Sequence, residues 1–595
     1  MTWHKFFKLK EGDIVVDLGA YIGETVAFYS KAVGKTGLVI ALEPDKDNYH
    51  RLEQMIKKRK LSNVVPLLMA IGKNTGIVDL RLTKGDNAHS TVLSTPRFRH
   101  RKRRVYAISW DDLMDAFALD HVDLVKVNVE GAEIEFLEGM SHVFPEKIAL
   151  DEHSRFGINL KHLMKLLKDQ KYLLIKKAST IPKHDNILYL KRGTEKPAIR
   201  ISDAVLEAGG RRIVNYLEVD EELKSFFNTA EFYAEYDVDV SNVPLGILNI
   251  PALSSIIHFA WAVGCDVSLG EIDETYLQGL EKVRKVLGGH PGYESLKFTT
   301  SIKPSKIVKN KFDNLKSKGL FFSGGCDSTA AYIKYREDNP KLITVWGLDI
   351  PTDWVKLWRK VIDQYKGMNI LKIKTNTEDM YSRSISDGID SLGRSIPEGY
   401  RPGYSFSFNT FGVAAPLTVV EGIGDLMLSS TYPSREYDDP EHPWSNKRPN
   451  HIIDEYMGWA NVKTRDVLCE YSTNEKVKHI IKPYFEEHGP MFLRSCGFRV
   501  YLEKHKFKRL NCLECDKCER VIGMLIVNGV DPNTCGFRIF HDTFDRIKSD
   551  IQDKRWNPTY LSYHWQEIRE QIPKEIDQNF GGSHWFLEWL RNYEL

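Results

Sequence analysis

Four cysteines in the C-terminal third of the chain have the residue type and spacing of a metal site. Three of them fall within seven residues and the fourth precedes these: Cys496, Cys512, Cys515 and Cys518. Four thiolates complete a closed tetrahedral zinc site, although an iron–sulfur cluster uses similar spacing. Cys469 or Cys535 could replace Cys496 as the fourth ligand. Because the N-terminus does not resemble a signal peptide, the clustering favours a metal over disulfides.

A second group of residues is suited to binding phosphate. After the apolar run KGLFF, the chain continues as Ser323-Gly-Gly-Cys-Asp-Ser-Thr329 and then has a helical pattern. The backbone amides of such a loop and the N-terminus of the helix can bind phosphate oxygens, and the hydroxyls add donors. No Lys-Ser/Thr pair ends the loop, so it is not a Walker A motif.

A third group lies near the N-terminus, where a strand pattern ends in Asp17-x-Gly19-x-x-x-Gly23 and a helix pattern follows. Glycines there permit a tight turn and close approach of a ligand to the backbone. Glu43 ends the next strand, 26 residues after Asp17, and can accept hydrogen bonds from two ribose hydroxyls. The spacing departs from G-x-G-x-x-G and provides no pyrophosphate site. A nucleoside ligand without phosphate is therefore expected.

The elements around these groups predict an α/β protein with two doubly wound parallel-sheet domains. Short Val/Ile/Leu-rich runs alternate with amphipathic stretches over residues 13–192, and the same rhythm resumes at 318. Between them lies an α+β connecting segment without this rhythm. We expect a first α/β domain at 1–192, the connecting segment at 193–317, a second α/β domain at 318–460, a cysteine-rich metal-binding region at 461–540 and a helical tail at 541–595.

Over residues 10–190 the chain resembles the FkbM family of methyltransferases. The runs VVDLGAYIGETVAFYS, ALEPDKDNYHRL and VDLVKVNVEGAEIEFLEGM carry this resemblance. It implies a Rossmann-like domain in which four residues hold S-adenosylmethionine and three lie near the methyl acceptor as catalytic residues. The first set is Asp17, Gly19, Gly23 and Glu43, and the second is Lys126, Glu130 and Glu133.

One position departs from the family pattern. Asn128 stands where the family usually has Asp. Asn keeps the hydrogen bonding but can neither accept a proton nor offer a charged metal ligand. His153, after a later strand, could serve as a base on the acceptor side or be structural.

The motif SGGxDS on a strand followed by a helix resembles the PP-loop of the ATP pyrophosphatases. The resemblance implies cleavage of ATP between its α and β phosphates, with adenylation of a carboxylate or carbonyl oxygen. Asp327 would position magnesium or the phosphates, and the phosphate-binding residues would be Ser323, Gly324, Gly325, Ser328 and Thr329.

The runs RSCGF and NCLECDKCERVIGML resemble the zinc-bearing C-terminus of the 7-cyano-7-deazaguanine synthase (QueC-like) branch of that family, over about 316–540. Zinc there is structural. The resemblance thus implies a stabilising Zn²⁺ on Cys496, Cys512, Cys515 and Cys518, and it does not extend to the deazaguanine substrate.

Charge and hydropathy limit the partners. Among the 595 residues, 83 Lys and Arg balance 81 Asp and Glu, so nothing attracts nucleic acid or a membrane surface in general. The basic run RFRHRKRR at 97–104 is expected to be a solvated loop. The most apolar window, Ile250–Cys265, is too short to span a membrane and predicts a buried helix. A cytoplasmic location is expected.

Together these features predict a bifunctional biosynthetic enzyme acting on small molecules. One domain would methylate a hydroxyl or amine with S-adenosylmethionine, and the other would use ATP and Mg²⁺ to adenylate a carboxylate or carbonyl for amide, nitrile or thio-type substitution. Two alternatives stay open. The protein could modify tRNA or another protein through the basic run, or one domain could be a binding module without activity.

Overall fold

The computed structural model describes residues 7–82, 89–90, 102–153, 158–179, 186–193, 196–289, 298–348, 350–382, 403–430, 452–496, 509–555 and 558–595. The described residues form two compact units, the first ending at Lys196 and the second beginning at Pro197. The boundary was expected at 192. Among the described helices, none is long and apolar enough to cross a membrane.

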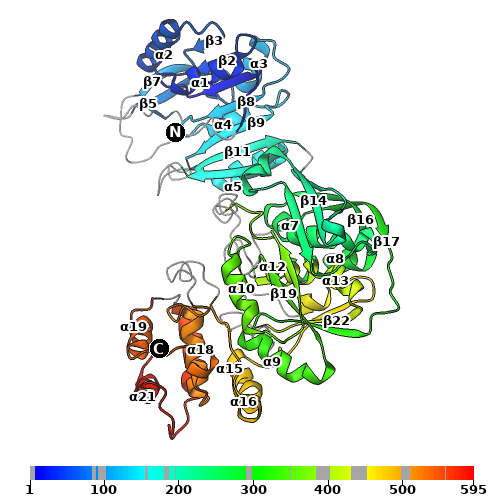
Figure 1. Ribbon diagram of the computed structural model, residues 1–595. Helices are drawn as coiled ribbons and strands as arrows, with labels where there is room; N and C mark the ends of the chain where they lie inside the picture. The colour runs from blue at the N-terminus through cyan, green and yellow to red at the C-terminus, as the bar shows by residue number, and fades with distance from the viewer. Residues whose placement is uncertain are drawn as a thin grey trace. The chain divides into compact units, whose positions relative to one another are not determined.

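The first unit is built on a seven-stranded sheet in the order β10-β11-β9-β8-β1-β2-β3 (Figure 1). Five neighbouring strands run parallel, while β11 is antiparallel to both of its neighbours. From β1 the chain proceeds to β2 and β3 on one side and later to β8 and β9 on the other. The carboxyl ends of β1 and β8 therefore border the crevice in which such sheets bind ligands. The strands are β1 (Ile14–Leu18), β2 (Leu38–Leu42), β3 (Val64–Leu67), β8 (Leu124–Val127), β9 (Lys147–Glu152), β10 (Tyr172–Ser179) and β11 (Asn186–Arg192).

Helices cover both faces of this sheet because successive strand residues point to opposite sides. Val15 of β1 packs in one core with α1 and α2, and Val16 packs in the other with α3, α4 and α5. The expected Rossmann-like α/β domain is confirmed. Its helices are α1 (Glu24–Val33), α2 (Lys46–Arg59), α3 (Trp110–Ala116), α4 (Glu133–Glu138) and α5 (Leu160–Asp169).

A small second sheet in this unit, ordered β4-β7-β5-β6, carries the described part of the basic run. Lys102 pairs with Asp79 at 3.0 Å and Arg103 pairs with Asp45 at 3.1 Å. Positions 97–101 of the run lie outside the described residues. The expected loop is thus a strand at its C-terminal end. The strands are β4 (Ala70–Gly72), β5 (Gly76–Leu82), β6 (His89–Ser90) and β7 (Lys102–Ser109).

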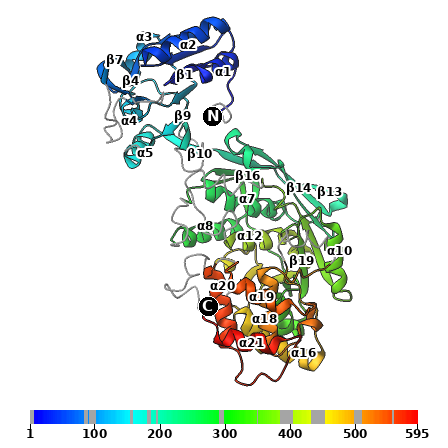
Figure 2. The same ribbon diagram turned by 90° about the vertical axis from the view of Figure 1, so that its left-hand side faces the viewer.

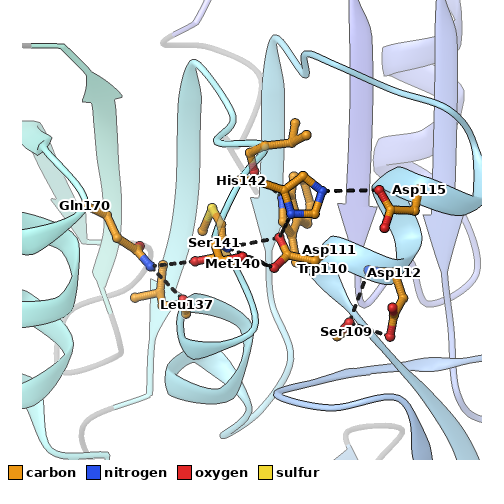
Figure 3. A network of polar contacts seen from close by, with 11 residues as sticks. Ser109, Trp110, Asp111, Asp112, Asp115, Leu137, Met140, Ser141, His142 and Gln170 are labelled. Atoms are coloured by element: carbon orange, nitrogen blue, oxygen red, sulfur yellow. Dashed lines mark hydrogen bonds and ion pairs between the residues drawn. The ribbon is translucent and has the colours of Figure 1, made fainter.

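A polar network ties α3 to the turn that follows α4 (Figure 3). The Asp111 carboxylate accepts hydrogen bonds from Ser141, from the backbone N–H at 2.9 Å and from the hydroxyl at 2.6 Å. The His142 ring lies between Asp111 and Asp115, at 3.3 and 3.2 Å. These contacts fix the position of α4, whose N-terminal end carries candidate site residues.

The second unit contains an eleven-stranded sheet in the order β17-β16-β12-β14-β15-β20-β19-β18-β22-β23, with β13 paired to β14. The strands β20, β19, β18, β22 and β23 are parallel. In this half the chain order reverses between β18 and β22. The strands are β12 (Ala198–Ile201), β13 (Val205–Glu207), β14 (Arg212–Val219), β15 (Glu231–Tyr236), β16 (Asp266–Asp273), β17 (Ile302–Val308), β18 (Ser317–Phe321), β19 (Lys341–Trp346), β20 (Ile370–Thr375), β22 (Ile423–Leu428) and β23 (Lys463–Asp466).

The segment 193–317, expected as a separate connecting subdomain, contributes strands to this same sheet. Its β15 pairs antiparallel with β20, so that Ala234 lies opposite Thr375. Consequently the sheet is mixed, whereas we expected a purely parallel one. The physical reason is edge pairing: an open parallel sheet leaves the N–H and C=O groups of β20 unpaired until β15 covers them.

The C-terminal residues share one core with the parallel strands. Leu320 of β18, the four clustered cysteines and Leu590 of the tail belong to a single set of buried residues. Both views show α18, α19 and α21 grouped together (Figures 1 and 2), and α19 and α20 both contact α21. As expected, the apolar α7 is buried along its whole length. The helices are α6 (Leu245–Leu248), α7 (Ile250–Val263), α8 (Glu274–Gly288), α9 (Cys326–Tyr335), α10 (Val355–Gln364), α12 (Gly403–Val413), α13 (Ala415–Val420), α14 (Ile452–Glu455), α15 (Thr473–Lys476), α16 (Lys482–His488), α18 (Asp516–Val527), α19 (Thr543–Gln552), α20 (Pro558–Glu570) and α21 (Ser583–Asn592).

Candidate functional sites

The loop between β1 and α1 depends on its two glycines. Gly19 has φ +77°, and a Cβ there would lie 2.0 Å from the backbone oxygen of Asn128. Gly23 has φ +90°, and its Cβ would lie 2.7 Å from a methyl group of Leu52. Only glycine therefore allows the loop to lie against β8 and α1 to pack on α2. The loop adjoins the expected crevice, at the carboxyl ends of β1 and β8.

Asp17 and Lys126 form a buried ion pair beneath this loop. Lys126 Nζ lies 2.9 Å from Asp17 Oδ1 and donates to the carbonyl of Gly19 at 2.7 Å. The Thr25 hydroxyl donates to Asp17 Oδ2 at 2.5 Å. The side chains of Asp17 and Lys126 are 0% and 3% exposed. In this arrangement Lys126, expected near the acceptor, fixes the loop.

Glu43 lies at the end of β2 and is held by two backbone groups. Its carboxylate accepts hydrogen bonds from the N–H of Tyr21 at 2.8 Å and of Asp45 at 3.0 Å. Burial raises the pKa of Glu43, while these hydrogen bonds act in the opposite direction. The contact with Tyr21 brings Glu43 beside the glycine loop, as the spacing predicted.

Glu130, Glu133 and His153 come together at the ends of β8 and β9. His153 Nδ1 lies 2.6 Å from Glu133, and Nε2 lies 3.3 Å from Glu130. Burial alone would lower the pKa of His153, but hydrogen bonds to the two carboxylates outweigh it and raise that pKa to about 11. The imidazole is therefore cationic at neutral pH. Glu133 is fully buried, whereas the Glu130 side chain is 27% exposed.

Asn128 lies at the carboxyl end of β8, beside Gly19. Its N–H donates to the carbonyl of Leu18 at 3.0 Å. Its side-chain oxygen is buried and accepts no hydrogen bond from a described residue. A buried acceptor of this kind is costly unless a ligand or water supplies a donor.

In the second unit, the Ser/Gly loop lies at the carboxyl end of β18 and leads into α9. The Ser328 hydroxyl donates to the carbonyl of Gly325 at 3.2 Å, and the amide of Ser323 donates to Ser328 at 3.3 Å. Gly324 has φ +75°. Thr329 is fully buried, and its hydroxyl has no hydrogen-bond partner among the described residues. The predicted strand, loop and helix are thus present.

A chain of polar contacts joins this loop to the ends of two neighbouring strands. The ammonium of Lys476 is completely buried and lies 3.1 Å from Asp327 Oδ1. It also donates to the carbonyl of Ser430, which follows β22, and the Ser430 hydroxyl donates to Asp466 at the end of β23. Asp327 additionally accepts from Thr473 at 2.9 Å. Burial raises the pKa of Asp466.

Sequence reasoning missed Asp466 and Lys476. Asp466 could have been found, because an acidic residue at the carboxyl end of a parallel strand is a recurrent position for site residues. Lys476 carries no local signal of this kind.

The four clustered cysteines converge as the spacing predicted. Their sulfur atoms all lie within 4.8 Å of one another, and all four residues are buried. Cys512 and Cys518 are 3.8 Å apart, and Cys496 and Cys515 are 3.9 Å apart. Four thiolates about 2.3 Å from a tetrahedral zinc are separated by roughly 3.8 Å, whereas a disulfide requires about 2.05 Å. The donor set therefore fits a tetrahedral metal ion.

The first unit thus has a glycine loop beside Glu43, and the second has a Ser/Gly loop and four clustered cysteines. Residues 17–174 match the family model of the methyltransferase FkbM domain. The chain therefore carries a methyltransferase domain of this family at its N-terminus.

A curated relative is the hexuronic acid methyltransferase AglP of Haloferax volcanii, which is 26% identical over 162 residues. The match covers 27% of this chain and 64% of that protein. Among solved structures, an FkbM methyltransferase from Methylobacillus flagellatus is 19% identical with a TM-score of 0.23, covering 31% of this chain and 45% of that one. A SAM-dependent methyltransferase from Aquifex aeolicus is 17% identical with a TM-score of 0.20, covering 31% and 85%.

Proposed function

We propose that the first unit transfers a methyl group from S-adenosylmethionine to a hydroxyl or amine of a small molecule. The observation that carries the proposal is the match of residues 17–174 to the FkbM domain. The Haloferax volcanii relative is named a hexuronic acid methyltransferase, which supports a small oxygen-rich acceptor. Hexuronic acids are accordingly the first acceptors to test.

The residues at the crevice fit this cofactor. The close approach of Gly19 to β8 excludes a side chain and leaves backbone to face the ligand. The fixed carboxylate of Glu43 can accept hydrogen bonds from both ribose hydroxyls. The buried side-chain oxygen of Asn128 can accept a hydrogen bond from the ligand, which would remove an unsatisfied polar atom.

S-adenosylmethionine, when bound, supplies a methyl group on a sulfonium, and transfer requires the acceptor to be aligned with it. His153 is cationic at neutral pH and does not accept a proton there. Glu130 is the more exposed of the two carboxylates that contact His153, so it can take the proton from the methyl acceptor. It would do the work of the Asp that the family usually has at position 128. Glu133 balances the charge of His153, and the His153 ring in turn positions Glu130.

Calorimetry with S-adenosylmethionine tests the cofactor site, and absence of binding heat would refute the methyltransferase proposal. Production of S-adenosylhomocysteine with hexuronic acids as acceptors tests the activity. Glu130→Gln should lower kcat at least tenfold with little change in cofactor affinity. Glu24→Gln, on the exposed start of α1, is the matched control and should leave both unchanged.

We further propose that the second unit cleaves ATP between the α and β phosphates and adenylates a carboxylate or carbonyl oxygen. The supporting observation is the SGGxDS loop at the carboxyl end of β18, where the strand order reverses. This is the position at which α/β sheets bind nucleotides. The loop amides and the hydroxyls of Ser323, Ser328 and Thr329 would bind the β and γ phosphates.

Two charged groups in this site have distinct roles under the proposal. Asp327 would hold Mg²⁺ or orient the phosphates, and the ammonium of Lys476, 3.1 Å away, holds its carboxylate in place. The cysteine cluster would bind Zn²⁺ as a structural ion, because four thiolates leave no open coordination position.

Incubation of the full chain with ATP, Mg²⁺ and candidate carboxylates should release AMP and pyrophosphate. Release of ADP would contradict the assignment. Ser328→Ala should weaken ATP binding about tenfold, while Ser549→Ala, an exposed position on α19, should not. The fusion of the two units suggests consecutive steps on one product.

A further inference from the structure

The Ser/Gly loop is held by the residues that lead into the cysteine cluster. The backbone N–H of Arg494 donates to the carbonyl of Gly324 at 2.7 Å. The Arg494 side chain donates through Nε to the carbonyl of Ser323 at 3.1 Å. The Tyr365 hydroxyl donates to the same Gly324 carbonyl at 3.3 Å. Two successive carbonyl groups of the loop thus face Arg494.

These contacts determine where the loop amides point. In a planar trans peptide the C=O and the following N–H point in opposite directions. With the carbonyls of Ser323 and Gly324 turned toward Arg494, the N–H groups of Gly324 and Gly325 point to the opposite side. Gly324, at φ +75°, has the conformational freedom to rotate if this restraint is lost.

Arg494 is in turn fixed by residues adjacent to the cysteines. Asn511, which precedes Cys512, donates to the carbonyl of Leu493 at 2.8 Å and accepts from the N–H of Ser495 at 2.8 Å. The Ser495 hydroxyl donates to the carbonyl of Lys517, which precedes Cys518, at 2.9 Å. Arg494 is itself two residues from Cys496. The segment on both sides of Arg494 is therefore attached to the cluster.

We propose that Arg494 is a positioning residue for the phosphate loop, and that through it metal binding by the cysteine cluster and anion binding by the loop depend on each other. The proposal rests on the phosphate-binding role assigned to the loop above. A metal ion held by the four thiolates would restrain Asn511 and Lys517, each of which adjoins one of the cysteines. Arg494 then holds the loop carbonyls on one side, so that the amides are oriented for an anion before it binds.

Linkage gives the proposal a quantitative form. If the metal strengthens anion binding by some factor, the anion must strengthen metal binding by the same factor. Loss of a hydrogen bond from a charged donor corresponds to about a tenfold change or more. We therefore expect Arg494→Met to bind inorganic pyrophosphate at least tenfold more weakly while keeping its metal.

The experiment titrates inorganic pyrophosphate into the full chain by calorimetry, with zinc loaded and after zinc is removed by a chelator. Zinc affinity is measured in parallel by competition with a chromogenic chelator, with and without pyrophosphate. The variants are Arg494→Met, Arg494→Lys and the control Arg359→Met, whose arginine is exposed on α10. Circular dichroism and zinc content report whether each variant is folded.

Removal of zinc should weaken pyrophosphate binding about tenfold, and pyrophosphate should raise zinc affinity by the same factor. Arg494→Met should stay folded and zinc-loaded yet bind pyrophosphate weakly, Arg494→Lys should recover part of the binding, and the control should match the wild type. Equal pyrophosphate affinity of the wild type and folded Arg494→Met would overturn the inference and leave the phosphate site intact. No binding of pyrophosphate or ATP to the zinc-loaded wild type would refute the proposed function itself.

Discussion

Substitution of Gly19 by Ala is the sharpest test of the first site, because the structure separates two costs at this position. One cost is backbone strain, since Gly19 has φ +77°. The other is a clash, since the new Cβ would lie 2.0 Å from the backbone oxygen of Asn128. Two other glycines of the same unit serve as controls, one with backbone strain but no clash and one with neither. Gly12 has φ +94° and its nearest neighbour at 3.9 Å, whereas Gly76 meets nothing within 4 Å and has no positive φ.

The expected magnitudes follow from this geometry. Gly12→Ala bears only the left-handed strain of about 1–2 kcal/mol, and Gly76→Ala should be neutral or slightly stabilising. Gly19→Ala bears the same strain, and the loop and β8 must also separate by about 1.4 Å to reach ordinary contact at 3.4 Å. That shift would disrupt the hydrogen bonds from Gly19 N to Leu42 and from Asn128 N to Leu18. These contribute about 1 kcal/mol each, so the total is on the order of 3–4 kcal/mol.

The assays are urea denaturation of the full chain and calorimetric titration with S-adenosylmethionine. Gly19→Ala should lower the free energy of unfolding by about 3–4 kcal/mol, as given by the strain and the two lost hydrogen bonds. Because the shift of about 1.4 Å also misplaces the loop that would face the cofactor, the variant should bind S-adenosylmethionine about 100-fold more weakly. Gly12→Ala should be less stable but should keep most of its affinity for S-adenosylmethionine. If the affinity of Gly19→Ala for S-adenosylmethionine is within twofold of the wild-type affinity, the close approach of Gly19 to β8 does not shape the cofactor site.

Three further outcomes are expected. Lys126→Met should lower the free energy of unfolding by about 3–5 kcal/mol because Asp17 is left as an unpaired buried charge, and adding Asp17→Asn should restore part of it in urea denaturation; no rescue would contradict the pairing. The folded-state pKa of His153, about 11, exceeds its ordinary value of 6.5, so its stabilisation is complete below pH 6.5 and is lost toward pH 11. The free energy of unfolding of the wild type should decline between pH 7 and 10, and this decline should be absent from folded His153→Gln. Parallel pH profiles of the two proteins would refute the stabilising role of the His153 cation. Metal analysis should find about one zinc per chain, lost in Cys512→Ser and kept in Cys535→Ser, a buried cysteine outside the cluster; iron with visible absorbance would refute the zinc assignment.

Several features of the fold and sites were predictable because they are local in sequence. The glycine spacing at 19 and 23 specifies a strand-to-helix turn, and the cysteine spacing at 512, 515 and 518 brings three thiolates together at the start of one helix. In the first domain the alternation of strand and helix patterns predicted the α/β class, since burial of a parallel sheet by helices imposes that rhythm. The FkbM domain itself is confirmed by its family match.

Other features depend on contacts between residues far apart in the chain. The Asp17–Lys126 pair, the Asp327–Lys476 pair across 149 residues and the Arg494 contact with the loop across 171 residues have no local signature. The same holds for the pairing of β15 with β20, because strand pairing is set by register and by which edge lies open. Backbone conformation and residue spacing are enough to specify the local motifs. The pairing of buried charges and the segment that orients each loop follow from long-range packing, because they depend on which distant groups folding removes from water together.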